Sequence, residues 1–161
     1  MSRTHCLALA SVVAVVLAIP QRLDAQLAPG GTSIDNFAKV NDHYFRGAQP
    51  EGRDYADLAA LGVKTVINLI GDSDLDVTEQ SMVEQHGMRY VHIAMSTRIP
   101  PTAKQLDTFL SLVNDAATQP VYVHCVGGRH RTGVMTAIYR MTNDGLTGDQ
   151  AFTEMKQFNY G

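Results

Sequence analysis

The residues with the clearest chemical potential lie together in ten positions, His124 to Gly133, with the sequence HCVGGRHRTG. This stretch combines one cysteine with two histidines, two arginines and three glycines. A thiol close to cationic side chains and free backbone N–H groups is stabilised as the thiolate, which is the nucleophilic form. The stretch therefore predicts a nucleophile surrounded by positive charge.

The glycines and one arginine of this stretch are suited to holding an anion. Gly127 and Gly128 allow the backbone to curl so that several N–H groups converge, and Gly133 permits close packing where a helix begins. Arg131 has a planar guanidinium that matches two oxygens of a phosphoryl group, which a lysine cannot do. We interpret the loop as a cradle for a tetrahedral dianion with Cys125 at its base.

Such a loop must be held between a strand and a helix. PVYVHC (120–125) is typical of a buried strand, and RTGVMTAIYRMTND (131–144) is typical of an apolar helix. The helix would point its first N–H groups back at the sulfur, a geometry that binds anions.

Short apolar runs and helical patterns alternate along the rest of the chain. The predicted strands are 43–50, 64–70 and 88–95, and the predicted helices are 52–62, 76–87, 102–116 and a last one from Thr147 towards Phe158. This order predicts an α/β fold with a central, mainly parallel sheet flanked by helices. Ligands bind such sheets at the carboxyl ends of the strands, where Cys125 is expected.

Helix ends are marked in the sequence as well. Gly62 and Gly87 are expected to stop two of the helices. Thr102 and Thr147 are each followed three residues later by a glutamine, which predicts two capping boxes.

The N-terminal residues have the features of a secretory signal peptide. Arg3 precedes the apolar run Cys6 to Ile19, and Pro20 and a small-residue site near Ala25 follow. A membrane anchor is the alternative, but this run is shorter than the ~20 apolar residues that span a bilayer. We expect a signal peptide at 1–25, a flexible lead-in at 26–34 and one domain at 35–161.

Composition supports a single compact domain. The chain has 161 residues, of which 45% are hydrophobic and 18% charged, as in a compact globular domain. Loss of residues 1–25 removes two of 13 basic and one of 16 acidic residues, which leaves a net charge of about −4. We therefore expect a secreted or periplasmic protein that binds no nucleic acid and keeps no integral membrane segment.

Cysteine usage singles out one thiol. Cys6 would leave with the signal peptide, so Cys125 would remain without an intramolecular disulfide partner. A lone cysteine is either a small buried hydrophobe or a reactive group. The glycines and arginines around Cys125 favour the reactive group.

The spacing of His-Cys, five residues and Arg-Thr-Gly resembles the signature loop of cysteine-dependent protein tyrosine and dual-specificity phosphatases. NFAKVNDHYFRGAQP (36–50) and LGVKTVINLI (61–70) resemble, more narrowly, the atypical dual-specificity phosphatases of the plant and fungal type and their bacterial relatives. The likeness covers roughly residues 35–158. It implies a dual-specificity phosphatase-like fold, a phosphatase domain at 35–161 and no metal or organic cofactor. The implied substrate is a phosphorylated protein or a small phosphorylated molecule, and the atypical group suggests inositol pyrophosphates.

The resemblance also implies a role for each residue of the loop. Cys125 would attack phosphorus and form a phosphocysteine, while Arg131 would clamp the phosphoryl group and stabilise the transition state. The Thr132 hydroxyl would donate a hydrogen bond to the departing sulfur, and His124 would hold the loop and tune the pKa of the thiol. Backbone N–H groups would complete the phosphate cradle, from Val126, Gly127, Gly128, Arg129, His130 and Arg131.

The general acid of most relatives is missing from its usual place. That place is the loop after the preceding strand, which here reads STRIPPT (96–102) and has no carboxylate. Asp72 or Asp74 is the candidate replacement, since acid catalysis requires only reach and a suitable pKa. Alternatively no acid is present, the substrates have good leaving groups, and Arg98 binds substrate at the rim.

Other interpretations remain open. The side chains of Arg129 and His130 either widen a cationic rim or are solvated, and His92, Met135 and Met141 are expected in the core. A catalytically weak phosphate-recognition module, a pseudophosphatase, is the main alternative function. A rhodanese-like sulfur carrier is disfavoured by the spacing and by Arg-Thr-Gly after the loop.

Overall fold

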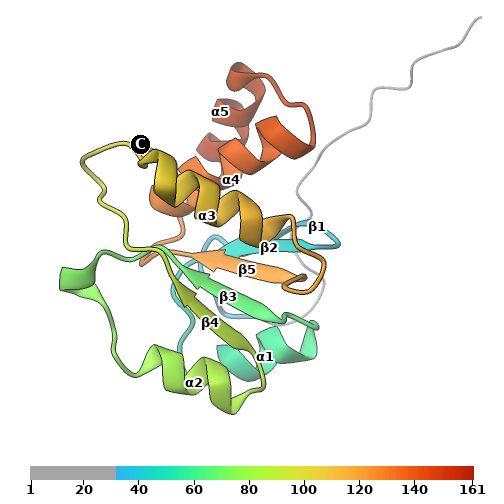
Figure 1. The fold of residues 1–161 in the computed structure, drawn as a ribbon, viewed down its shortest axis with the longest axis vertical. Helices are drawn as coiled ribbons and strands as arrows, with labels where there is room; N and C mark the ends of the chain where they lie inside the picture. Colours follow the sequence, from blue (N-terminus) through green and yellow to red (C-terminus); the bar gives the residue numbers. More distant parts are fainter. Residues whose placement is uncertain (1–31) are drawn as a thin grey trace, which may run out of the picture.

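The computed structural model describes residues 32–161, so the predicted signal peptide (1–25) and most of the lead-in lie outside the described residues. One five-stranded sheet in the order β1-β2-β5-β3-β4 forms the centre of the described part. Helices cover both faces of this sheet (Figure 1). The predicted α/β fold class is confirmed.

The strands are short and mostly parallel. β2 pairs with β5, β5 with β3, and β3 with β4 in parallel, whereas β1 pairs antiparallel with β2. The strand bounds are β1 (Ala38–Asn41), β2 (Tyr44–Gly47), β3 (Thr65–Asn68), β4 (Arg89–His92) and β5 (Val121–His124). Every predicted strand is present, but β1 was not predicted. Only one of its four residues is fully buried, so its sequence AKVN mixes apolar and polar residues and lacks the apolar pattern of a strand.

Two apolar layers hold the helices to the sheet. Successive strand residues point to opposite faces. One buried cluster therefore contains Tyr44, Ile67, Val121 and Val123, and a separate one contains their neighbours Phe45, Val66 and Tyr122. One cluster includes Phe109 and lies under α3 and α4, and the other includes Leu58 and lies over α1 and α2. Both faces are buried, which explains the nearly continuous apolar runs of β3 and β5.

The helices follow the predicted order, and they are up to three residues shorter at either end than predicted. They are α1 (Asp54–Ala60), α2 (Glu79–Gln85), α3 (Ala103–Val113), α4 (Arg131–Asn143) and α5 (Gly148–Gln157), with a short 3-10 helix η1 (Asp72–Asp74) before α2. Gly62 and Gly87 have φ of +83° and +76°, as expected for residues that stop a helix. The capping boxes at Thr102 and Thr147 are both present.

One core prediction is right and one is wrong on α4. Met135 is fully buried under the sheet face, whereas Met141 is 38% exposed. The last turn of α4 extends past the core, so Met141 has the helical spacing of a core residue without a layer to cover it. Between residues 32 and 161, none of the helices has the length and apolar surface that a membrane-spanning segment needs.

Candidate active site

The loop from Cys125 to His130 connects the end of β5 to the start of α4. Cys125 is 3% exposed and immediately follows the buried strand, so the strand delivers the sulfur to the sheet edge. α4 begins at Arg131, and no side chain caps its first turn. Its first N–H groups are therefore free to bind an anion in front of the sulfur.

The environment of Cys125 favours the thiolate. Burial raises the pKa of this thiol, but the other influences outweigh burial and lower the pKa below its ordinary value. These influences are hydrogen bonds from the Thr132 side chain and backbone, the charge of Arg131 and a hydrogen bond from the Gly128 N–H. Thr132 Oγ1 is buried and makes no hydrogen bond within residues 32–161 that would compete with the sulfur. The predicted neighbours of the sulfur are therefore brought together.

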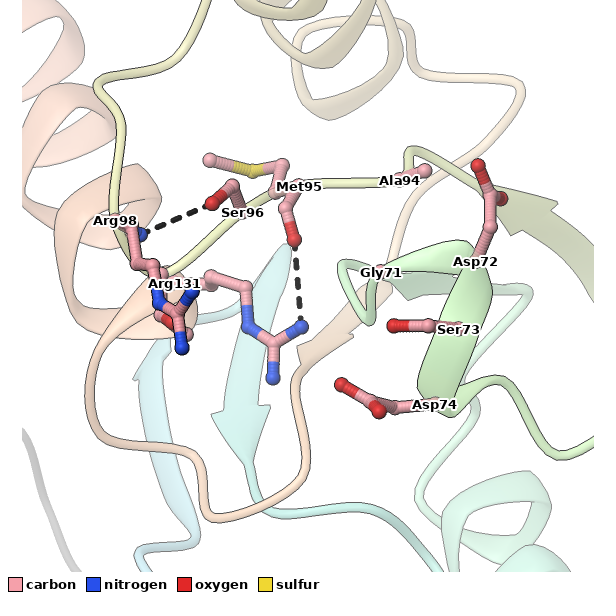
Figure 2. A pocket seen from close by; sticks show the side chains of 10 residues that line it. Gly71, Asp72, Ser73, Asp74, Ala94, Met95, Ser96, Arg98 and Arg131 are labelled. Carbon is pink, nitrogen blue, oxygen red and sulfur yellow. Dashed lines mark hydrogen bonds between the residues drawn. The ribbon is translucent and has the colours of Figure 1, made fainter.

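Arg131 faces a cavity of about 530 Å³ beside the loop. Its Nη1 donates to the Met95 carbonyl at 3.4 Å, which holds the guanidinium over the sheet edge (Figure 2). The side chain is only 8% exposed, and its buried Nε has no partner among residues 32–161. Donors left open in this way suit a phosphoryl oxygen.

His124 is held from behind the loop by a buried polar network. Nε2 of His124 lies 2.8 Å from Oε1 of Glu79, and both side chains are fully buried. The other carboxylate oxygen of Glu79 accepts from Asn68, whose Nδ2 also donates to the Tyr90 hydroxyl at 3.0 Å. The imidazole also stacks on the ring of Tyr122 at 5.7 Å. The approach of Glu79 and the stacking on Tyr122 pack the imidazole directly before Cys125, and neither of its ring nitrogens makes a hydrogen bond within residues 32–161.

The two candidate acids lie on η1 across the cavity from Arg131. Asp72 and Asp74 both line the cavity, and Figure 2 shows Asp74 turned towards Arg131 and Asp72 turned away. The Asp72 side chain is 84% exposed, and its Oδ1 lies 3.9 Å from Nδ1 of His92. His92 is half-buried, with Nε2 2.7 Å from the Ile70 carbonyl, so it lies at the sheet edge rather than in the core.

The cationic rim is formed mainly by Arg98. This residue is exposed and lines both the first cavity and a second one of about 370 Å³. His130 lines the second cavity together with Tyr160, and their rings are 5.7 Å apart. The Arg129 side chain is exposed and lines neither cavity, which agrees with the interpretation of a solvated loop residue.

The comparisons with known proteins identify the family. A family model described as "DSP-PTPase phosphatase fused to NAD+ Kinase" matches residues 25–160, which is most of the chain. The chain belongs to this DSP-PTPase family. The resemblance inferred from the HCVGGRHRTG loop is thereby confirmed.

Curated DSP-PTPase relatives carry two kinds of name. The chain is 29% identical to the dual specificity protein phosphatase TpbA of Pseudomonas aeruginosa over 126 residues, which are 78% of this chain and 56% of TpbA. It is 27% identical to the inositol diphosphatase DSP5 of Arabidopsis thaliana over 108 residues, which are 65% of this chain and 53% of that protein. The chain thus spans just over half the length of these relatives.

Solved structures agree with this assignment. The crystal structure of TpbA matches with a TM-score of 0.70 and 28% identity over 87% of this chain and 83% of TpbA. The catalytic core of the phosphatase SIW14 from Saccharomyces cerevisiae matches with a TM-score of 0.69 over 78% of this chain and 76% of that one. At 23% identity, the SIW14 match supports the DSP-PTPase fold alone.

Glu79 and Asn68 are site residues that the sequence did not predict. Glu79 opens a helix whose other residues are mostly polar, so it has the pattern of a solvated residue, yet it is fully buried. Asn68 offered a weak signal, because a polar side chain ends the apolar run of β3. Both residues belong to the DSP-PTPase site through His124.

Proposed function

We propose that this chain is a cysteine-dependent phosphatase that hydrolyses phosphate esters through a phosphocysteine intermediate. The observation that carries the proposal is the position of Cys125 at the base of the loop, before the uncapped amino end of α4, where Thr132 and Arg131 lower the pKa of its thiol. A module that only recognises phosphate does not need an activated thiol. The pseudophosphatase interpretation is therefore not favoured.

The first chemical step transfers the phosphoryl group to sulfur. The Cys125 thiolate attacks phosphorus, the ester P–O bond breaks, and the leaving oxygen departs as an oxyanion that takes its proton from water. Arg131 and the N–H groups of the loop bind the equatorial oxygens, whose charge grows in the transition state. Thiol catalysis of this kind splits one difficult hydrolysis into two easier displacements.

The second step returns the enzyme to its starting state. Water attacks the phosphocysteine, loses a proton and releases inorganic phosphate as the S–P bond breaks. The departing sulfur becomes a thiolate again, and the hydrogen bonds from Thr132 stabilise that charge. The same contacts that lower the thiol pKa therefore serve both steps.

We propose that this phosphatase works without a dedicated general acid. General acids are tuned by burial and by neighbouring groups, whereas Asp72 and Asp74 are both exposed. The loop 96–102 offers Arg98 in place of a carboxylate, which suits binding of a second anionic group rather than proton donation. Substrates with good leaving groups, namely aryl phosphates and phosphoanhydrides, fit this site.

A substrate panel tests the proposal. The protein is incubated with p-nitrophenyl phosphate, a phosphotyrosine peptide, a phosphoserine peptide and an inositol pyrophosphate, and released phosphate is measured. TpbA has been solved with phosphotyrosine, and DSP5 is named an inositol diphosphatase, so both classes belong in the panel. We expect turnover of the two aryl phosphates, p-nitrophenyl phosphate and the phosphotyrosine peptide, and of the inositol pyrophosphate, which is a phosphoanhydride. No phosphate release from any of the four would contradict the function.

We further propose that the protein acts in the periplasm or outside the cell. The apolar run Cys6 to Ile19, flanked by Arg3 and a small-residue site near Ala25, supports this proposal. The full chain is expressed in a host with a periplasm, and its N-terminus is determined by mass spectrometry. We expect an exported form that begins near Gln26, whereas an uncleaved cytoplasmic form would refute export.

A further inference from the structure

Three successive carbonyls of the loop are bound from the side away from the sulfur. The Val126 carbonyl accepts from the Gln49 N–H at 3.2 Å, and the Gly127 carbonyl accepts from Asn36 Nδ2 at 2.8 Å. The Gly128 carbonyl accepts from Nη2 of Arg46. All three donors come from residues 36–49, a segment that none of the steps above uses.

These contacts determine where the loop N–H groups point. In a planar trans peptide, the N–H of one residue points opposite to the carbonyl of the residue before it. Carbonyls held outward at 126, 127 and 128 therefore turn the N–H groups of Gly127, Gly128 and Arg129 inward. The hydrogen bond from the Gly128 N–H, which lowers the pKa of Cys125, agrees with this orientation.

Arg46 is an unusual anchor because its charge is buried. The side chain is fully buried, and its guanidinium lies over the Phe158 ring with Cζ 3.8 Å from the ring centroid. Within residues 32–161 Arg46 makes no ion pair, and its Nε has no hydrogen-bond partner. A buried cation without a carboxylate is costly, so it requires another source of negative charge.

The active site supplies that negative charge. Burial lowers the pKa of Arg46, and the groups that oppose this effect are, largest first, Tyr44, Glu154, Cys125 and Tyr122. Burial raises the pKa of Tyr44 and of Tyr122, so both phenols stay neutral. Glu154 is already paired with Arg140 at 3.0 Å. Among these groups, the Cys125 thiolate is therefore the anion left to balance the charge of Arg46.

Asn36 is fixed by hydrogen bonds at both ends of its side-chain amide. Its Oδ1 accepts from Asn159 Nδ2 at 2.9 Å while its Nδ2 donates to Gly127, so both ends of the amide are fixed. Its backbone has φ of +53°, a left-handed conformation that asparagine tolerates better than most residues. Residues 158 and 159 therefore support both anchors from the C-terminal end of the chain.

We propose that Arg46 and Asn36 are positioning residues for phosphoryl transfer. They turn the loop N–H groups towards the phosphate, and Arg46 adds a buried positive charge behind the Cys125 thiolate. This inference rests on the proposed function, but its test needs no turnover. Phosphate-like binding and thiol reactivity report the two effects directly.

The test compares two variants with two matched controls. Arg46→Lys keeps a positive charge but loses the flat fork over Phe158, and Asn36→Gly keeps the left-handed backbone but loses the amide. Arg140→Lys alters another buried arginine, which pairs with Glu154 and Asp144 away from the loop. Asn41→Ala removes an asparagine that donates to the Tyr139 hydroxyl instead.

Two quantities are measured in every variant: the pH dependence of Cys125 alkylation by iodoacetamide, and the affinity for tungstate by calorimetry. We expect Arg46→Lys and Asn36→Gly each to move the alkylation midpoint upward by about one pH unit and to weaken tungstate binding about tenfold. The controls are expected to lower the melting temperature while both quantities stay at their wild-type values.

The outcomes separate this inference from the proposed function. Wild-type alkylation and tungstate affinity in Asn36→Gly and in folded Arg46→Lys overturn the inference, as do equal shifts in the controls. If Arg46→Lys does not fold, Asn36→Gly alone decides. A wild-type protein that hydrolyses no phosphate ester overturns the proposed function, while the shifts in the variants still test the role of the anchors.

Discussion

At the scale of single residues, the chemistry depends on whether burial or the neighbouring polar groups determine the charge of the Cys125 sulfur. Burial alone would keep Cys125 as a neutral, inert thiol. Hydrogen bonds from Thr132 and Gly128 and the charge of Arg131 outweigh burial, so the pKa of the thiol is lowered. The residue types of the loop were sufficient to predict this environment of the thiol from the sequence, because the residues that act on the sulfur lie within seven positions of it.

The lowered pKa of Cys125 makes a prediction about pH. The thiolate exists above the pKa, so a lowered pKa extends alkylation by iodoacetamide to pH values below the ~8.5 of an ordinary cysteine. Thr132→Val removes the hydroxyl with little change in shape, and we expect the alkylation midpoint to rise. An unchanged midpoint in Thr132→Val would show that the hydroxyl does not act on the sulfur.

Arg131 makes a prediction about rate. Arg131→Lys keeps the charge but loses the planar pair of donors, so we expect kcat on p-nitrophenyl phosphate to fall by about two orders of magnitude. The control is Arg140→Lys on the same helix, where we expect lower stability and an unchanged kcat. Equal kcat values for Arg131→Lys and the wild type would mean that Arg131 only supports the fold.

At the scale of helices and strands, hydrophobic periodicity and helix-end signals were sufficient to predict most of the elements. Helix ends at Gly62 and Gly87 and the boxes at Thr102 and Thr147 are local features, so the sequence predicts them well. β1 is an edge strand with one buried residue out of four, and such a strand leaves little apolar pattern.

The short helix η1 decides what kind of phosphatase this is. Both of its carboxylates are exposed, so we expect Asp72→Asn and Asp74→Asn each to leave p-nitrophenyl phosphate hydrolysis within about threefold, a barrier change below ~0.7 kcal/mol. For the wild type, kcat/KM should decline steeply as the phenol pKa of a series of aryl phosphates rises.

A general acid on η1 would give a different result. A working acid gives a bell-shaped pH profile and tolerance of poor leaving groups. Should either substitution remove the basic limb of that profile and reduce kcat/KM by about a hundredfold, that aspartate is the general acid. The acid-independent mechanism would then be wrong.

At the scale of the whole molecule, the order of elements was predictable but the contacts between distant segments were not. Alternating strands and helices predict the sheet, and the sheet places the loop at its carboxyl edge. That Glu79 reaches His124, or that Arg46 and Phe158 meet behind the loop, depends on how segments remote in the sequence pack together. A polar residue within an apolar strand, as at Arg46, is the only local sign of such a contact.

The central claim is that the Cys125 sulfur is the nucleophile, and Cys125→Ser tests it most directly. A serine hydroxyl occupies nearly the same space, but it is not ionised at neutral pH and is a far weaker nucleophile. Phosphate release from p-nitrophenyl phosphate is measured alongside tungstate binding, which shows that the cradle is intact. We expect undetectable turnover with tungstate still bound. A variant that binds tungstate and keeps more than roughly a few per cent of wild-type kcat would contradict thiol catalysis.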